Sequence, residues 1–307
     1  MLLALLACAL DPAPYEAPPF DAPAAPEAGI QLHVPAVELA AGEERERCLY
    51  VATPHDADAW VSRIELVARP GLHHAMLVKA PEARTDEEDC FGIPEALMDD
   101  YTSVPEPVFA SSTQVTEEAV AFPDGVALPL AAHQPMMIDY HLLNTGDEPM
   151  TGEVWINLHF READDEPEAA RLYVMANITG IDVPAQGEQT LTTTCSFPSD
   201  ATVLSLTPHM HAHGRSFTAS VVSPAGETPL LDTTRWENPE TTWFDPTLAV
   251  SAGDAIRFTC AYTNDGDEPI GFGPTADDEM CMLFGYHWPA DDLLWRADYD
   301  PSACTVE

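Results

Sequence analysis

The chain has 307 residues, with 12 Lys or Arg against 52 Asp or Glu, so its formal charge at pH 7 is −40. Binding to nucleic acid is improbable, because affinity for nucleic acid rests on clustered Lys and Arg. The scarcity of Lys and Arg also disfavours binding to anionic membrane surfaces. The hydrophobic content of 46% supplies enough apolar surface for a folded core, which argues against global disorder and favours about two domains.

The N-terminus predicts an exported protein. Residues 5–8 read LLAC, which resembles a bacterial lipobox, the site at which a cysteine is acylated after signal cleavage. We therefore expect residues 1–8 to be a short lipoprotein signal with Cys8 as the lipidation site, and the Pro- and Ala-rich residues 9–29 to be an extended linker. The predicted location is the periplasm, the cell surface or the medium, with a lipid anchor as the only membrane contact.

Short runs rich in Val, Ile, Thr and aromatic residues recur between turn signals along the rest of the chain. They alternate as strands do, and segments with helical periodicity are scarce. Examples are RCLYVAT, WVSRIELVA, EVWINLHF, SFTASVV and AIRFTCAY. Many short strands at regular spacing predict an all-β protein made of two antiparallel sandwiches, over residues 30–172 and 173–307.

Six cysteines remain once Cys8 is set aside, an even number that favours disulfides in an exported chain. None of them is close enough to another in sequence for a zinc–thiolate motif. Sequence alone leaves the pairing open, and chain order favours one early bridge and two within the later half. The six are Cys48, Cys90, Cys195, Cys260, Cys281 and Cys304.

Histidines carry the clearest chemistry in the sequence. In the run His209-Met210-His211, alternate residues of a strand share a face, so two imidazoles would stand side by side and form half of a metal site. The alternative is a solvated polar face, but the run is flanked by apolar residues. His213 precedes a glycine and is left out of the ligand set.

Two further histidine positions are ambiguous when considered alone. The neighbours His73 and His74 would point to opposite faces of a regular strand, so they can bind one ion together only at a strand end or a bulge. The preceding Pro70-Gly71 turn favours such an irregularity. A single histidine such as His141 is more often a hydrogen-bonded residue of the core or its rim.

Taken together, the motifs resemble the copper type II, ascorbate-dependent monooxygenases, the family of peptidylglycine α-hydroxylating monooxygenase and dopamine β-monooxygenase. The resemblance covers residues 30–307 and rests on four motifs in order: HHAMLV, IDYHLLN, HMHAHGR and DDEMC. It implies that each sandwich is an eight-stranded antiparallel jelly roll that binds one copper. Residues 30–172 would be the N-terminal copper domain and residues 173–307 the C-terminal copper domain.

The resemblance also implies the ligands and the disulfides. The first copper would be held by His73, His74 and His141, and the second by His209, His211 and Met280. The disulfides would be Cys48–Cys90, Cys260–Cys281 and Cys195–Cys304. Imidazoles suit copper in both oxidation states, and a thioether favours Cu(I). Met280 has an alternative interpretation as a gap-filling core residue.

The implied reaction is hydroxylation of a C–H bond with dioxygen and an ascorbate-like external reductant. Dioxygen would react at the copper held by His209, His211 and Met280, while the other copper stores an electron. The peptide-amidating branch has an arginine two residues before its His-x-His motif, whereas this chain has Thr207. Without that cation we expect a neutral or cationic small-molecule substrate. Two other functions stay open, an exported copper buffer or delivery protein without catalysis, and a glycan-binding module that uses tryptophans.

Overall fold

The structure is a computed structural model of the chain, and it contains strands and turns without a helix in the part it describes. The described residues are 17–90, 106–161, 166–177, 179–237, 239–273, 275, 277–290 and 304–306. The predicted all-β class is therefore confirmed. Among these residues no helix is present that has the length and apolar character needed to cross a membrane. Cys8 lies outside the described residues.

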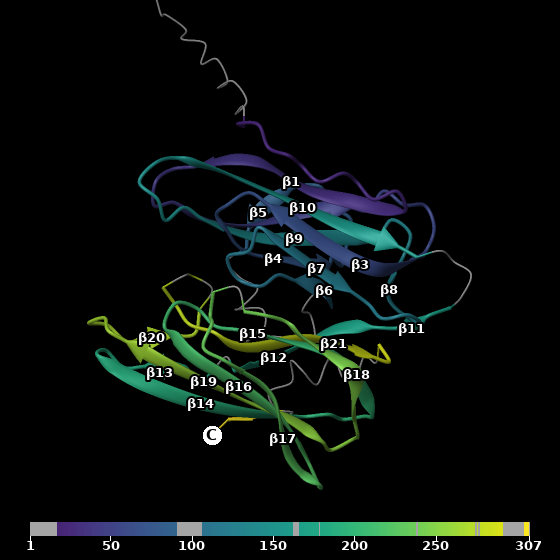
Figure 1. Ribbon diagram of the computed structural model, residues 1–307. Helices are drawn as coiled ribbons and strands as arrows, with labels where there is room; N and C mark the ends of the chain where they lie inside the picture. Colours follow the sequence, from purple (N-terminus) through teal and green to yellow (C-terminus); the bar gives the residue numbers. More distant parts are fainter. Residues whose placement is uncertain are drawn as a thin grey trace, which may run out of the picture.

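The first sandwich consists of a six-stranded and a five-stranded sheet (Figure 1). The six-stranded sheet contains β1 (Gly29–Leu39), β10 (Met150–Phe160), β3 (Ala59–Ala68), β8 (Val126–Leu130) and β11 (Glu168–Ala169) in that order, with β7 (Glu117–Ala121) also paired to β3. The five-stranded sheet contains β5 (Glu87–Asp89), β2 (Glu44–Ala52), β9 (Pro135–Leu143), β4 (Leu72–Lys79) and β6 (Glu106–Ala110). Pairing is antiparallel except between β11 and β8.

The second sandwich has a five-stranded and a four-stranded sheet. The five-stranded sheet contains β17 (Gly226–Thr233), β16 (Gly214–Ser223), β19 (Ala255–Asn264), β14 (Gly187–Ser196) and β22 (Cys304–Val306). The four-stranded sheet contains β12 (Arg171–Asn177), β21 (Cys281–Trp288), β15 (Ala201–His209) and β18 (Thr242–Val250). A small sheet pairs β13 (Asp182–Val183) with β20 (Ile270–Gly271).

Strand pairing changes from the first sandwich to the second between β11 and β12. The former pairs with β8 and the latter with β21, so the change falls at residues 169–171. The predicted division between residues 172 and 173 lies close to this point. The eight-stranded jelly-roll arrangement of each sandwich stays a prediction.

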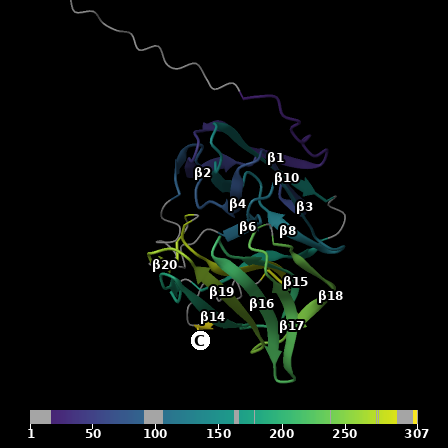
Figure 2. The same cartoon turned by 60° about the vertical axis from the view of Figure 1, so that its left-hand side comes forward.

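The four-stranded sheet of the second sandwich packs against the first sandwich, as the two views of the ribbon show (Figures 1 and 2). Strand β12 is buried on both faces because its alternate side chains enter different cores. Leu172 and Val174 join the core of the first sandwich, whereas Tyr173 and Met175 join that of the second. Polar contacts reinforce the junction, including the Tyr286 hydroxyl, which donates to the Val108 carbonyl at 3.0 Å. The interface is therefore a continuous apolar core.

Three disulfides are present, and they are the pairs that the family resemblance implies. Cys48 bonds Cys90, Cys195 bonds Cys304, and Cys260 bonds Cys281. The last of these connects β19 to β21 and so joins the two sheets of the second sandwich. Three disulfides are typical of an exported protein, since reducing compartments rarely preserve them.

The predicted linker is partly packed. Residues 17–28 have no strand or helix, but Phe20 stacks on Trp155 with 5.2 Å between ring centroids, and the Arg69 guanidinium lies over the Phe20 ring. Arg69 also donates to the Pro18 carbonyl at 2.8 Å. This part of the predicted linker thus lies against the first sandwich, because the aromatic ring finds an apolar partner there.

Candidate metal centre

Five histidine side chains meet where the two sandwiches touch. His73 and His74 lie near the start of β4, His141 lies on β9, His209 ends β15, and His211 follows two residues later. All five are buried, with relative exposures from 1% to 9%. So many imidazoles in one buried cluster are far more polar than the surrounding apolar core.

A β-bulge lets the neighbouring histidines face the same cluster. In the pairing of β4 with β9, Leu72 pairs with Leu142 and His74 pairs with His141, so His73 is one extra residue on β4. The donor atoms of His73, His74 and His141 all lie within 4.8 Å of one another, close enough to hold one metal ion. These three residues, the histidine trio, satisfy the geometric condition that the sequence set for the doublet.

The histidines of the second sandwich lie against the trio. The His209 and His211 ring centroids are 5.1 Å apart. Across the junction, the His73 and His211 centroids are 5.4 Å apart, and those of His74 and His209 are 6.2 Å apart. The sequence suggested two separate centres, whereas the structure brings all five rings into one continuous cluster.

Several ring nitrogens in the cluster are buried without a hydrogen-bond partner in the described part of the chain. They are both nitrogens of His73, Nδ1 of His74, Nδ1 of His141 and Nε2 of His211. A buried polar atom without a partner is costly, and a cluster of such atoms is typical of an ion-binding site. The unpartnered nitrogens therefore fit a metal.

Two of the rings are held through their other nitrogen. His141 Nε2 donates to the Glu44 carboxylate at 2.7 Å, and His211 Nδ1 donates to the Asp278 carbonyl at 3.0 Å. A metal-binding histidine commonly donates its second N–H in this way, which fixes the tautomer and leaves the opposite nitrogen free for the metal. Neither partner was identified from the sequence, because Glu44 and Asp278 are remote from the histidines along the chain.

Burial keeps the imidazoles neutral. Desolvation lowers the pKa of His73 to about 3 and that of His211 to about 4, and it places the pKa values of His74 and His209 well below the usual value. The pKa of His141 is also lowered by burial, although Glu44 opposes the shift. Neutral imidazoles offer lone pairs to a metal without first losing a proton.

Glu279 joins the predicted methionine ligand to the His-x-His loop. This residue has no exposed surface, and its carboxylate accepts hydrogen bonds from the backbone N–H groups of His211 at 3.0 Å, His213 at 2.6 Å and Met280 at 3.2 Å. Burial raises the pKa of Glu279 to about 7. The acidic residue directly before Met280 is thus buried and holds the His-x-His loop.

The side chain of Met280 is partly buried and packs against the core of the first sandwich. Its backbone carbonyl accepts a hydrogen bond from the Tyr262 hydroxyl at 2.8 Å. Glu279 thus holds the backbone at residue 280 beside the loop of His211, while the role of Met280 as a ligand stays a prediction. His213 is half-buried, and its ring contacts none of the five in the cluster among the ring contacts of the described residues.

His73 also lines a pocket of about 210 Å³ beside the cluster. Its walls include the apolar side chains of Leu72, Val115 and Leu143, and no Asp, Glu, Lys or Arg lines it within the described residues. The pocket is therefore suited to a small uncharged group.

Comparison with known families connects the second sandwich to copper chemistry. Residues 170–303 match the family described as copper type II ascorbate-dependent monooxygenase, C-terminal domain. The matched stretch contains His209, His211 and Met280, whereas the histidine trio lies outside it. The resemblance that the motifs indicated is thereby confirmed for this part of the chain.

Solved structures that are similar to the chain share little of its detail. The glycosylasparaginase PNGase F from Flavobacterium meningosepticum is 11% identical, with 90% of this chain and 99% of that chain covered and a TM-score of 0.38. The PBSX exported protein XepA is 10% identical, with 78% and 88% covered and a TM-score of 0.26. Similarities this weak carry no argument about function.

Proposed function

We propose that this protein is a copper-dependent monooxygenase that hydroxylates a C–H bond of a neutral or cationic small molecule, with dioxygen and an ascorbate-like reductant. One observation carries the proposal: buried imidazole nitrogens without hydrogen-bond partners converge from both sandwiches, and His211 among them lies in the domain that matches the monooxygenase family.

The donor types fit two coppers per chain. The first would be held by the histidine trio and the second by His209, His211 and Met280. Imidazole and thioether donors bind copper well, and the thioether favours Cu(I). When bound, copper supplies the one-electron chemistry that activates dioxygen, which amino-acid side chains cannot provide.

The residues of the chain orient and shield this site. Glu44 and the Asp278 carbonyl hold the rings of His141 and His211, so that the opposite nitrogens are preorganised for binding. The apolar core around the cluster excludes water and keeps the imidazoles neutral. The ring contact between His73 and His211 supports a short distance between the two ligand sets.

The surroundings of the cluster support an uncharged or cationic substrate. The pocket at His73 has no charged wall. At the position of the family's arginine, the Thr207 hydroxyl is engaged with the Thr241 hydroxyl at 2.8 Å, so no cation is supplied there. A chain charge of −40 repels anions and attracts cations.

Oxygen uptake by copper-loaded protein tests the proposal. Ascorbate-dependent uptake with a panel of neutral and cationic aromatic compounds should fall at least about a hundredfold in His211→Ala. His213→Ala is the matched control, because it removes a histidine of the same motif from outside the cluster, and it should keep the activity. Incorporation of isotopically labelled dioxygen into product distinguishes hydroxylation from copper-catalysed oxidation of ascorbate.

If wild type and His211→Ala bind different amounts of copper but consume oxygen equally slowly with every compound, the protein is a copper buffer or delivery protein. That outcome would overturn the monooxygenase proposal.

We also propose that the protein reaches the periplasm or cell surface as a lipoprotein acylated at Cys8. Mass spectrometry of the mature N-terminus tests this, since a diacylglyceryl cysteine at residue 8 supports it and an unmodified terminus contradicts it.

A further inference from the structure

A second cluster of potential metal ligands adjoins the histidine trio on the same sheet. Glu46 on β2 and His74 on β4 both pair with His141 of β9, and Asp139 lies two residues before His141, so all of these side chains share one face. The donor atoms of Glu46, His74 and Asp139 lie within 4.8 Å of one another. This carboxylate cluster contains one imidazole and two carboxyl groups.

The two acids are buried, and no cation pairs with either of them in the part of the chain that the structure describes. Glu46 is 8% exposed and Asp139 is 5% exposed, and Asp139 Oδ1 has no hydrogen-bond partner within the described residues. The nearby arginines are engaged elsewhere, Arg45 with Glu43 and Arg47 with acids of β5. Burying two adjacent carboxylates without a cation is costly, because neither charge is compensated.

We propose that Glu46, His74 and Asp139 bind a divalent cation of the Mn²⁺ type, at a site beside the histidine trio. A cation there would neutralise both carboxylates and give the unpartnered oxygen of Asp139 a ligand bond. The donor set favours such an ion because carboxylate oxygens suit Mn²⁺, whereas a set of imidazoles alone suits copper. The site shares His74 with the histidine trio, so it is tested on the copper-free protein, where the result does not depend on the monooxygenase function.

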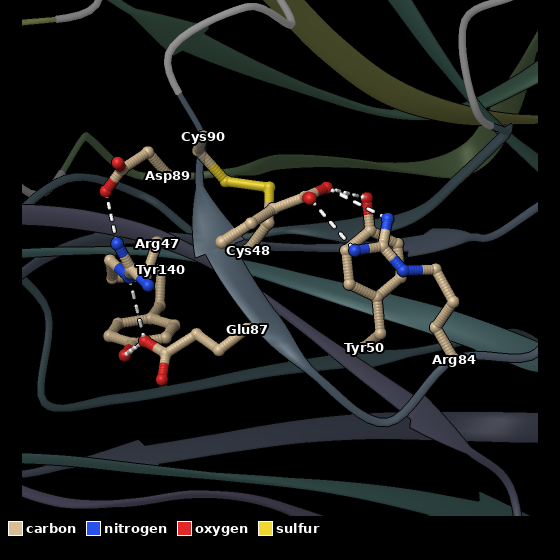
Figure 3. The surroundings of a disulfide bond; sticks show 9 residues. Arg47, Cys48, Tyr50, Arg84, Glu87, Asp89, Cys90 and Tyr140 are labelled. Atoms are coloured by element: carbon tan, nitrogen blue, oxygen red, sulfur yellow. Dashed lines mark hydrogen bonds and ion pairs between the residues drawn. A yellow bond between two sulfur atoms is a disulfide. The ribbon is translucent and has the colours of Figure 1, made fainter.

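An acidic pocket borders strand β2, which carries Glu46. The pocket has a volume of about 440 Å³, and its lining includes Glu44 and the buried Glu46. Its lining also includes Glu87 and Asp89, which both form ion pairs with Arg47, as Figure 3 shows beside the Cys48–Cys90 disulfide. A concave surface with an excess of one charge raises the local concentration of the opposite ion. The pocket therefore raises the cation concentration beside the strand that carries Glu46.

Titration with Mn²⁺, followed by the loss of its free-ion electron paramagnetic resonance signal, tests the proposal. The copper-free full chain is used at high ionic strength, which screens the surface acids. Wild type should bind a single tight Mn²⁺ per chain. Asp139→Asn and Glu46→Gln, which keep the side-chain volume but remove the charge, should each weaken that binding by about tenfold or more.

Two further variants make the result specific. His73→Ala removes a member of the trio that is outside the carboxylate cluster, so tight Mn²⁺ binding should persist. Glu118→Gln is the matched control for loss of a carboxylate in the same sandwich, since its hydrogen bonds are to Ser112. It should bind Mn²⁺ as wild type does.

Unchanged Mn²⁺ affinity in both Asp139→Asn and Glu46→Gln would overturn the proposal. The proposal would also fail if Glu118→Gln weakened Mn²⁺ binding as much as these two variants do, because binding would then reflect general attraction to an acidic chain. Circular dichroism establishes that each variant is folded, and either of the two cluster variants suffices for the comparison. Failure of the monooxygenase proposal appears in oxygen uptake and leaves this titration unaffected.

Discussion

Gly285→Ala is expected to disrupt the sheet that carries part of the metal centre. Gly285 lies in the middle of β21, where it pairs with Tyr173 of β12. A Cβ atom at this position would lie 2.1 Å from the Ser205 carbonyl oxygen and 2.5 Å from the Tyr173 hydroxyl oxygen. The Tyr173 hydroxyl also donates to that carbonyl at 3.1 Å in the buried core. Both neighbours would therefore have to move.

The expected cost follows from two contributions. Ser205 contributes a backbone atom that cannot rotate away, and overpacking of this kind costs about 1–3 kcal/mol. Loss of the buried Tyr173–Ser205 hydrogen bond adds about 1–3 kcal/mol. We expect the free energy of unfolding to fall by about 4 kcal/mol, near the middle of the combined range. Gly271→Ala is the matched control, because the nearest atom to its added Cβ is 4.0 Å away.

Urea denaturation of the copper-free variants measures the difference. Gly271→Ala should change the free energy of unfolding by no more than about 0.5 kcal/mol. Strand β21 begins directly after Met280, and its Met282 pairs with His209, so Gly285→Ala should also weaken copper binding at the proposed second site. If the two alanine variants unfold at free energies within about 1 kcal/mol of each other, the steric argument is wrong.

Three further predictions concern charges, cross-links and ring orientation. Burial and the neighbouring Glu44 raise the pKa of Glu46 from 4.5 to about 7. The metal-free protein should therefore lose up to about 3 kcal/mol of stability as the pH rises from about 4.5 to about 7. In urea unfolding, Glu46→Gln should flatten the dependence of stability on pH over this range. Replacing Cys260 and Cys281 by alanine opens a cross-link that spans 21 residues. The free energy of unfolding in urea should fall by about 3 kcal/mol, and a loss below about 1 kcal/mol would contradict this. Glu44→Gln should weaken copper binding at the histidine trio by about 10- to 100-fold in a competition titration, because the His141 ring loses its charged partner. Unchanged copper affinity would show that Glu44 does not orient the His141 ring for binding.

The sequence predicted the all-β class because alternation of apolar and polar residues is a local property of a strand. It also singled out the histidines that the structure brings together. His209 and His211 are separated by a single residue, and this spacing brings two rings together in any extended segment. The family resemblance added the disulfide pairs, which six cysteines alone leave open.

The tertiary structure decided what lies opposite those residues. Strand β12 is apolar at consecutive positions, so its pattern alone does not indicate that Leu172 and Tyr173 enter different cores. The bulge at His73 depends on the register between β4 and β9. Glu279 is buried because the backbone of the His-x-His loop supplies its hydrogen bonds.

Contact between the two histidine groups was likewise beyond the sequence. Residue spacing specifies which side chains share a face of one strand, since that depends on a few consecutive backbone angles. Whether His73 meets His211 depends on how one whole sandwich packs on the other, and that is determined by the shapes of many apolar side chains acting together.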